Sequence, residues 1–170
     1  LDLSDKTVRS YLDILTGTFM VRQLHPWYEN IGKRQVKAPK IYLRDSGILH
    51  ALLNLPDFQT LHGYPRVGAS WEGFAIEQIL RIIKPPQAFF WATHSGAEID
   101  LFFIFHGRRY GIECKFSEAP KTTKSMNQAL ESLNLAHLWI IHPGEHPYPL
   151  SKQISVWPMK DIAALPKQLR

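Results

Sequence analysis

Two neighbouring apolar runs near the middle of the chain, residues 99–105 and 110–116, carry charges where a buried strand should have none. Asp100 lies in the first run, and Glu113 and Lys115 lie in the second. Because successive side chains of a strand point to opposite faces, Glu113 and Lys115 must share one face. Burying such charges costs free energy unless they pair with each other or bind a cation. The sequence therefore predicts that this stretch forms a strand pair that carries a functional site.

The composition limits the class of protein. A chain of 170 residues with 45% hydrophobic and 21% charged residues is typical of a globular protein with one domain or two small ones. Its single cysteine excludes an internal disulfide framework and a multi-cysteine zinc site, and it fits a reducing cytoplasm. No apolar run approaches the ~20 residues that cross a bilayer, and no signal peptide opens the chain, so we expect a cytoplasmic protein without membrane contact. The net charge of +5 mildly favours polyanionic partners.

The first 54 residues predict the latter part of a winged-helix-like module. Ser4 is the expected N-cap of an amphipathic helix over residues 5–17. Strands are expected at 19–24 and 41–43, and a helix over 45–53 follows. This order lacks the first helices of such a module, and the chain enters a helix almost at once. We therefore expect a fragment of a longer protein.

Two interpretations of this module remain open. In the first, it binds DNA, with Lys6 and Arg9 of the helix in a groove and the cations of a basic turn on phosphates. These cations are Lys33, Arg34, Lys37 and Lys40. In the second, the module packs against another domain and its charges are merely solvated. We therefore expect either DNA or a neighbouring domain as its partner.

After a linker of turn-forming residues at 55–67, the elements follow in a regular order over residues 68–170. The expected elements are a helix over 68–84, strands at 88–93, 99–105 and 110–116, a helix over 122–133, a strand at 138–142, a last strand near 154–157 and a short terminal helix. The order α-β-β-β-α-β predicts a mixed α/β (α+β) domain without internal repeats.

The predicted helix over 68–84 contains two acids on different faces. Glu72 shares a face with apolar residues at offsets of four, seven and eleven, and this face should pack on the sheet. Glu77 instead lies one turn before Arg81 and is well placed for a surface ion pair. We therefore expect Glu72 at a buried edge near the strands and Glu77 in solvent.

The order of Glu72, Asp100 and the Glu113-x-Lys115 triplet resembles the PD-(D/E)xK phosphodiesterase superfamily, which has the restriction-endonuclease-like fold. The resemblance covers about residues 68–157. It implies that Asp100 and Glu113 hold Mg²⁺, that Glu72 completes or orients the shell, and that Lys115 positions water or steadies the phosphate. The alternative is a pair of strand-end salt bridges, either Glu113 to Lys115 or Asp100 to Arg108.

The implied chemistry suits these residue types. Mg²⁺ prefers hard oxygen ligands and keeps several waters, so two or three carboxylates suffice. The ion polarises a phosphoryl oxygen and lowers the pKa of a bound water, and a lysine stabilises the developing charge. The sequence therefore predicts either a magnesium-dependent site or a relic of one.

A narrower resemblance covers the whole chain. The segments KTVRSYLDIL, APKIYLRDSGIL, ASWEGFAIEQIL, FFWATHSGAEIDLFF and YGIECKFS occur in this order. They resemble the C-terminal half of a bacterial and archaeal group of predicted P-loop ATPases, whose tail is called domain of unknown function 4143. No GxxxxGK[ST] loop is present, so we expect no ATP site here and an ATPase domain upstream.

Two other side chains near the site are weaker candidates. His94, just before Gly96, is either a ligand or base or an ordinary loop histidine. Cys114 points away from Glu113 and Lys115, so we expect a buried core thiol.

Two functions therefore remain open. The chain is either a Mg²⁺-dependent DNA phosphodiesterase or a non-catalytic tail of an ATPase that binds DNA, another protein or the ATPase domain. The oligomeric state stays open.

Overall fold

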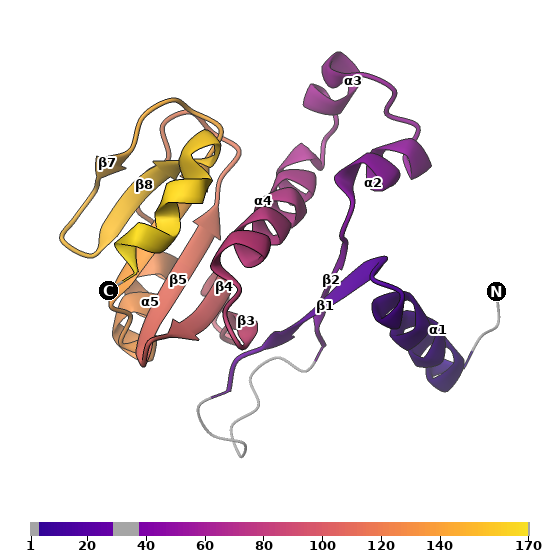
Figure 1. The fold of residues 1–170 in the computed structure, drawn as a ribbon, viewed down its shortest axis with the longest axis horizontal. Coiled ribbons are helices and arrows are strands. Elements are labelled where there is room, and N and C mark those ends of the chain that lie inside the picture. The colour runs from indigo at the N-terminus through magenta and orange to yellow at the C-terminus, as the bar shows by residue number, and fades with distance from the viewer. Residues whose placement is uncertain (1–3, 29–37, 170) are drawn as a thin grey trace.

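The charged hairpin that the sequence predicts is present in the structure, a computed structural model that describes residues 4–28 and 38–169 (Figure 1). Strands β4 (Glu98–Phe105) and β5 (Arg108–Cys114) pair antiparallel. The turn between them has positive φ at both central residues, 48° at His106 and 75° at Gly107. Two such residues in a tight turn match the twist of the flanking strands. The hairpin register is therefore set by the turn that joins the two runs.

In the described part of the chain, eight strands form one mixed sheet in the order β2-β1-β3-β4-β5-β6-β8-β7. The remaining strands are β1 (Val21–Pro26), β2 (Lys40–Leu43), β3 (Ala88–Ala92), β6 (His137–His142), β7 (Tyr148–Pro149) and β8 (Ile154–Pro158). Strands β3, β4 and β5 form an antiparallel meander, whereas β5, β6 and β8 run parallel. The mixed α/β class that the sequence predicts is confirmed, and β4 and β5 lie near the middle of the sheet.

Helices cover both faces of the sheet (Figure 1). On one face, α4 (Val67–Ile83) packs beside the terminal 3-10 helix η1 (Met159–Gln168), and their apolar side chains share a core with alternate residues of β4 and β5. On the other face, α5 (Lys124–Leu133) packs on the alternate set of strand residues. The two cores explain why the inner strands are apolar on both sides. They also explain why a charge on β4 or β5 is buried.

The N-terminal hairpin extends the same sheet. Strand β1 pairs antiparallel with β2 and parallel with β3, the latter through His25 opposite Phe89 and Pro26 opposite Phe90. Helices α1 (Asp5–Gly17) and α2 (Ser46–Leu52) flank this hairpin. A short helix, α3 (Phe58–His62), lies within the range that the sequence predicts as a linker. The winged-helix and restriction-endonuclease-like parts of the fold prediction, and the division into domains, stay predictions.

Glu77 is buried, so the prediction that it lies in solvent is wrong. Its exposed fraction is 3%, and it accepts hydrogen bonds from Arg22 and Arg44, with Arg44 Nε 3.1 Å from Glu77 Oε2. The prediction considered only partners on the same helix, such as Arg81. The N-terminal hairpin instead covers this face of α4 and supplies both guanidinium groups.

None of the helices described between residues 4 and 169 is long and apolar enough to cross a bilayer.

Candidate functional site

Asp100 and Glu113 lie on adjacent strands at the end of the β4–β5 ladder. The last pair of this ladder joins Leu101 and Ile112, and each acid lies one residue beyond that pair. The two carboxyl groups are close enough for the charge of Asp100 to raise the pKa of Glu113. Each acid is 7% exposed, and Asp100 Oδ2 accepts a 2.8 Å hydrogen bond from the backbone N–H of Cys114. The structure thus brings together the two acids that the sequence placed at one site.

Lys115 pairs with one oxygen of Glu113 and leaves the other unsatisfied. Its Nζ lies 2.6 Å from Glu113 Oε1, which is one of the salt bridges that the sequence left open. Glu113 Oε2 is buried and has no hydrogen-bond partner within residues 4–28 and 38–169. An unsatisfied buried acceptor costs about 1–3 kcal/mol. This oxygen is therefore positioned to accept a proton or a cation.

A cation from the N-terminal hairpin enters the cluster. Lys40 Nζ lies 2.9 Å from Glu72 Oε1 and 3.2 Å from Asp100 Oδ1, and it also pairs with Glu98. To reach them it passes over β3, with Nζ 5.5 Å from the centroid of the Phe90 ring. The sequence placed Lys40 among the cations that contact phosphates. The structure instead surrounds it with carboxylates.

Glu72 is held at the edge of this cluster by α4 and β2. The apolar face that it shares with Ile76 and Ile79 is buried, as predicted. Glu72 Oε1 accepts hydrogen bonds from Lys40 Nζ and from the hydroxyl of Tyr42. Burial and the neighbouring Glu72 raise the pKa of Tyr42, so its hydroxyl stays a donor. Glu72 thus holds Lys40 and Tyr42 in place at the cluster.

Burial raises the pKa of both strand acids. The pKa of Asp100 rises to about 6 because of burial and of Glu72, with Lys40 opposing the shift. The pKa of Glu113 rises to about 7 because of burial and of Asp100, with Lys115 opposing the shift. Burial acts to lower the pKa of the Lys40 ammonium, but Asp100 and Glu72 outweigh it and raise that pKa. The lysine is therefore charged near neutral pH, whereas the two strand acids still hold protons part of the time.

The formal charges of the cluster do not balance. Its members are the carboxylates of Glu72, Glu98, Asp100 and Glu113 and the ammonium groups of Lys40 and Lys115. Four negative and two positive charges leave an excess of two negative charges when every group is ionised. One divalent cation would neutralise this excess.

The donor set fits magnesium in its chemistry. Mg²⁺ often takes only one or two carboxylates and keeps its waters. Asp100 and Glu113, whose Oε2 is unsatisfied, would supply them. Among the described residues, however, no three His, Cys, Asp or Glu side chains are arranged to hold a metal ion. The magnesium site, with Glu72 as a further ligand, stays a prediction.

Lys40, Tyr42 and Glu98 belong to the cluster, and the sequence interpretation missed them. Lys40 and Tyr42 are two apart on β2, so they share a face, a signal that resembles the Glu113-x-Lys115 spacing. It was hidden because Lys40 ends a run of basic residues. Cys114 is a buried core thiol, as predicted, and burial raises its pKa.

Besides Lys40, five cations were predicted to contact DNA. Lys6 and Arg9 lie on the exposed surface of α1. Lys33, Arg34 and Lys37 lie outside the described residues. The prediction that these five side chains contact nucleic acid stays untested.

The fold and the cluster define a mixed α/β domain with buried carboxylates and a lysine on adjacent strands. Residues 67–162, more than half of the chain, match the model of the family described as Domain of unknown function (DUF4143), and the chain belongs to this family. This match confirms, at the level of the family, the resemblance to domain of unknown function 4143. Residues 1–59 match a second family, Domain of unknown function (DUF8612).

The chain is similar to two longer mycobacterial proteins. It is 47% identical over 162 residues to Uncharacterized protein Rv2008c of Mycobacterium tuberculosis and to Uncharacterized protein Mb2031c of Mycobacterium bovis. Each match covers 95% of this chain and 37% of the relative, so the chain spans little more than a third of their length. Protein VC1899 from Vibrio cholerae, a crystal structure, aligns with a TM-score of 0.35 and 15% identity over 99% of this chain and 44% of that one.

Proposed function

We propose that the chain is a divalent-metal-dependent phosphodiesterase acting on DNA, with a PD-(D/E)xK restriction-endonuclease-like domain. The observation that carries the proposal is the position of Glu113. Its Oε2 is buried without a partner among residues 4–28 and 38–169, on the strand next to that of Asp100, while Lys115 holds the other oxygen. Two neighbouring acids and an adjoining lysine are the groups that such hydrolysis needs.

The chain's own groups divide the work. Asp100 and Glu113 would hold the ion, which when bound polarises the phosphoryl oxygen and lowers the pKa of a water. Lys115 Nζ, half-buried beside Glu113, stabilises the negative charge that develops on the phosphate. Glu72 keeps Lys40 and Tyr42 in place at the rim. Since Asp100 and Glu113 must lose their protons, the activity should rise with pH through the range of their raised pKa values.

The test is cleavage of supercoiled, single-stranded and branched DNA by the purified chain with Mg²⁺ or Mn²⁺. Asp100→Asn and Glu113→Gln should each abolish cleavage. They should also abolish the binding of Mn²⁺, which calorimetry measures. Lys115→Met should abolish cleavage but keep Mn²⁺ binding. Glu131→Gln, an exposed acid on α5, is the matched control and should behave as wild type. Failure to bind Mn²⁺ or to cleave any of these substrates would overturn the proposal.

A second candidate function rests on Lys40. Its ammonium group pairs with Glu72, Glu98 and Asp100. In an inactive descendant of a nuclease, a lysine in this position would take the place of the metal ion. The chain would then be a non-catalytic tail that binds DNA or protein, attached to a P-loop ATPase domain in the longer protein. Lys6 and Arg9 on α1, in the winged-helix-like module, would contribute the DNA contacts.

The two candidates differ in a simple measurement. A non-catalytic tail should bind DNA with an affinity that falls steeply with salt, or bind the ATPase domain, and should show no metal-stimulated cleavage. Lys6→Gln combined with Arg9→Gln should weaken this DNA binding, and Lys160→Gln, an exposed lysine on η1, is its control.

A further inference from the structure

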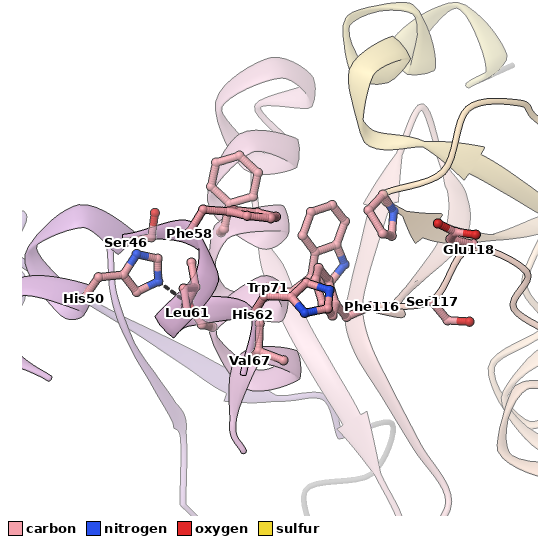
Figure 2. Close-up of a pocket in the computed structure, with 13 residues that line it drawn as sticks. Ser46, His50, Phe58, Leu61, His62, Val67, Trp71, Phe116, Ser117 and Glu118 are labelled. Carbon is pink, nitrogen blue, oxygen red and sulfur yellow. Dashed lines mark hydrogen bonds between the residues drawn. The ribbon is translucent and has the colours of Figure 1, made fainter. Parts of the chain in front are cut away.

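A second feature of the molecule, beside the carboxylate cluster, is a cavity of about 540 Å³ whose lining includes a series of aromatic rings (Figure 2). It lies between α2, α3, the start of α4 and the segment that follows β5. The rings form a continuous series, with centroid distances of 5.8 Å from Phe58 to His62, 5.8 Å from His62 to Phe116 and 5.7 Å from Phe116 to Trp71. Phe74 lies 6.0 Å beyond Trp71. This volume is in the range of small-molecule sites.

The cavity also offers a few polar groups. His50 Nε2 and Ser70 Oγ are 2.7 Å apart at one side, as the dashed line in Figure 2 shows, and Ser117 and Glu118 line another. The indole N–H of Trp71 is buried and has no acceptor anywhere in the part of the chain that the structure describes. Because this nitrogen is buried, it is not accessible from the cavity. The rings and the serine, histidine and glutamate groups thus suit a flat ligand with polar edge atoms.

The aromatic cavity adjoins the carboxylate cluster. Phe116 directly follows Lys115, and Trp71 directly precedes Glu72. A second cavity, of about 550 Å³, is lined by Lys40 and Glu72. The two cavities share three lining residues, Ser46, Ser70 and Phe74. The aromatic cavity thus lies next to the cluster, through Phe116 beside Lys115 in the chain and through the second cavity at Lys40 and Glu72.

We propose that the aromatic cavity is a nucleobase subsite, and this inference rests on the proposed function of the cluster. An unpaired base next to the bound phosphodiester stacks among Trp71, Phe116 and His62. A base has both a flat face for the rings and polar edge atoms for the serine and histidine groups of the lining, and its backbone carries the phosphate toward Lys115. Because a paired base cannot enter, the substrate class is single-stranded or locally unpaired DNA.

Binding tests this inference without requiring cleavage. The full chain is titrated, in Ca²⁺ and again in EDTA, with a single-stranded oligonucleotide, its duplex and an abasic strand of the same length. The single strand should bind about tenfold more tightly than the abasic strand, since stacking of one base contributes about 1–3 kcal/mol. Binding of the single strand should also quench part of the tryptophan fluorescence of the chain. The Trp71→Phe variant should lack this quenched part.

Two exposed phenylalanines form a matched pair of variants. Phe58 lines the cavity and is 75% exposed, whereas Phe19 is 74% exposed and lies beside Arg44, away from the cavity. Neither substitution removes core packing. Phe58→Leu should weaken single-strand binding several-fold, and Phe19→Leu should leave it unchanged.

The outcomes separate this inference from the proposed function. Base-dependent binding that Phe58→Leu weakens, in a chain that cleaves nothing, supports the subsite and contradicts the phosphodiesterase. Cleavage by a chain that binds the abasic strand equally well supports the phosphodiesterase and overturns the subsite. Quenching at Trp71 by an apolar peptide and not by any oligonucleotide also overturns the subsite, because it assigns the cavity to a protein partner.

Discussion

Lys40 Nζ lies 3.2 Å from Asp100 Oδ1, although sixty residues separate the two in the sequence. Lys40 begins β2 at one edge of the sheet, and Asp100 lies on β4 near its middle. The contact exists because the N-terminal hairpin extends the sheet beside β3 and α4 packs on one face of it. It makes Lys40 the group against which any cation at the cluster must compete.

Replacing Lys40 by Gln should therefore change both stability and metal binding. Without metal, the loss of its charge leaves Glu72, Glu98 and Asp100 to repel one another, and we expect a loss of about 2 kcal/mol in the free energy of unfolding. Millimolar Mg²⁺ should restore most of this loss, and Mn²⁺ should bind more tightly than to wild type. Urea unfolding in EDTA and in Mg²⁺, with calorimetry, measures both. An equal loss in both buffers would contradict the prediction.

Stability should fall as the pH rises from about 4 to about 7. The pKa values of Asp100 and Glu113 are raised in the folded state, so the folded chain binds more protons than the unfolded chain in this window. Each pKa unit corresponds to about 1.4 kcal/mol, so the two carboxyl groups together should lower the free energy of unfolding by roughly several kcal/mol across this window. Urea unfolding at pH 5 and pH 7.5 measures it. Glu113→Gln should flatten the dependence, and a stability that rises through this window in wild type would contradict it.

A site residue could be predicted from the sequence where its partners lie on the same element or on a neighbouring one in the chain. The spacing of Asp100, Glu113 and Lys115 along two strands determines which side chains share a face, and that part was predictable. Glu72 was predictable from the periodicity of its helix. Lys40 was not, because its partners come from elements that are distant in the sequence, and a lysine in a basic run gives no local sign of burial.

The fold shows the same limit. The helices and strands from 68 onward follow the predicted order because caps, turns and apolar runs define them locally. The parallel pairing of β1 with β3 depends on tertiary packing, and Glu77 was misplaced for this reason: Arg22 and Arg44 reach it from that hairpin. The periodicity of one helix does not reveal what covers its second face.

Glu77→Gln should destabilise the chain. The substitution removes the charge that Arg22 and Arg44 share, and it leaves two half-buried guanidinium groups beside a neutral side chain. Because both arginines keep some contact with water, we expect a loss of roughly 2 kcal/mol rather than the larger cost of a fully buried pair. Thermal and urea unfolding measure it, and Glu131→Gln on α5 serves as control. A loss no larger than that of the control would contradict the prediction.

Two glycines of α4 should respond in opposite ways to alanine. A Cβ at Gly68 would have no atom within 4 Å, so Gly68→Ala should stabilise the chain by up to about 1 kcal/mol through helix propensity. A Cβ at Gly73 would lie 3.1 Å from Tyr42 Cδ1, and the hydroxyl of Tyr42 is held by Glu72. Gly73→Ala should therefore gain nothing or lose stability. Equal gains in the unfolding temperature at both positions would show that Tyr42 moves freely.

The attachment of the N-terminal hairpin has a consequence for how such chains can diverge. Its ladder with the rest of the sheet is short, with His25 opposite Phe89 and Pro26 opposite Phe90. Among the described residues, Lys40, Arg22 and Arg44 add charged connections. Their acidic partners lie in the region matched by a different family model. A chimera of two relatives joined between residues 59 and 67 would have to match these charges, so the two regions should be inherited as one unit.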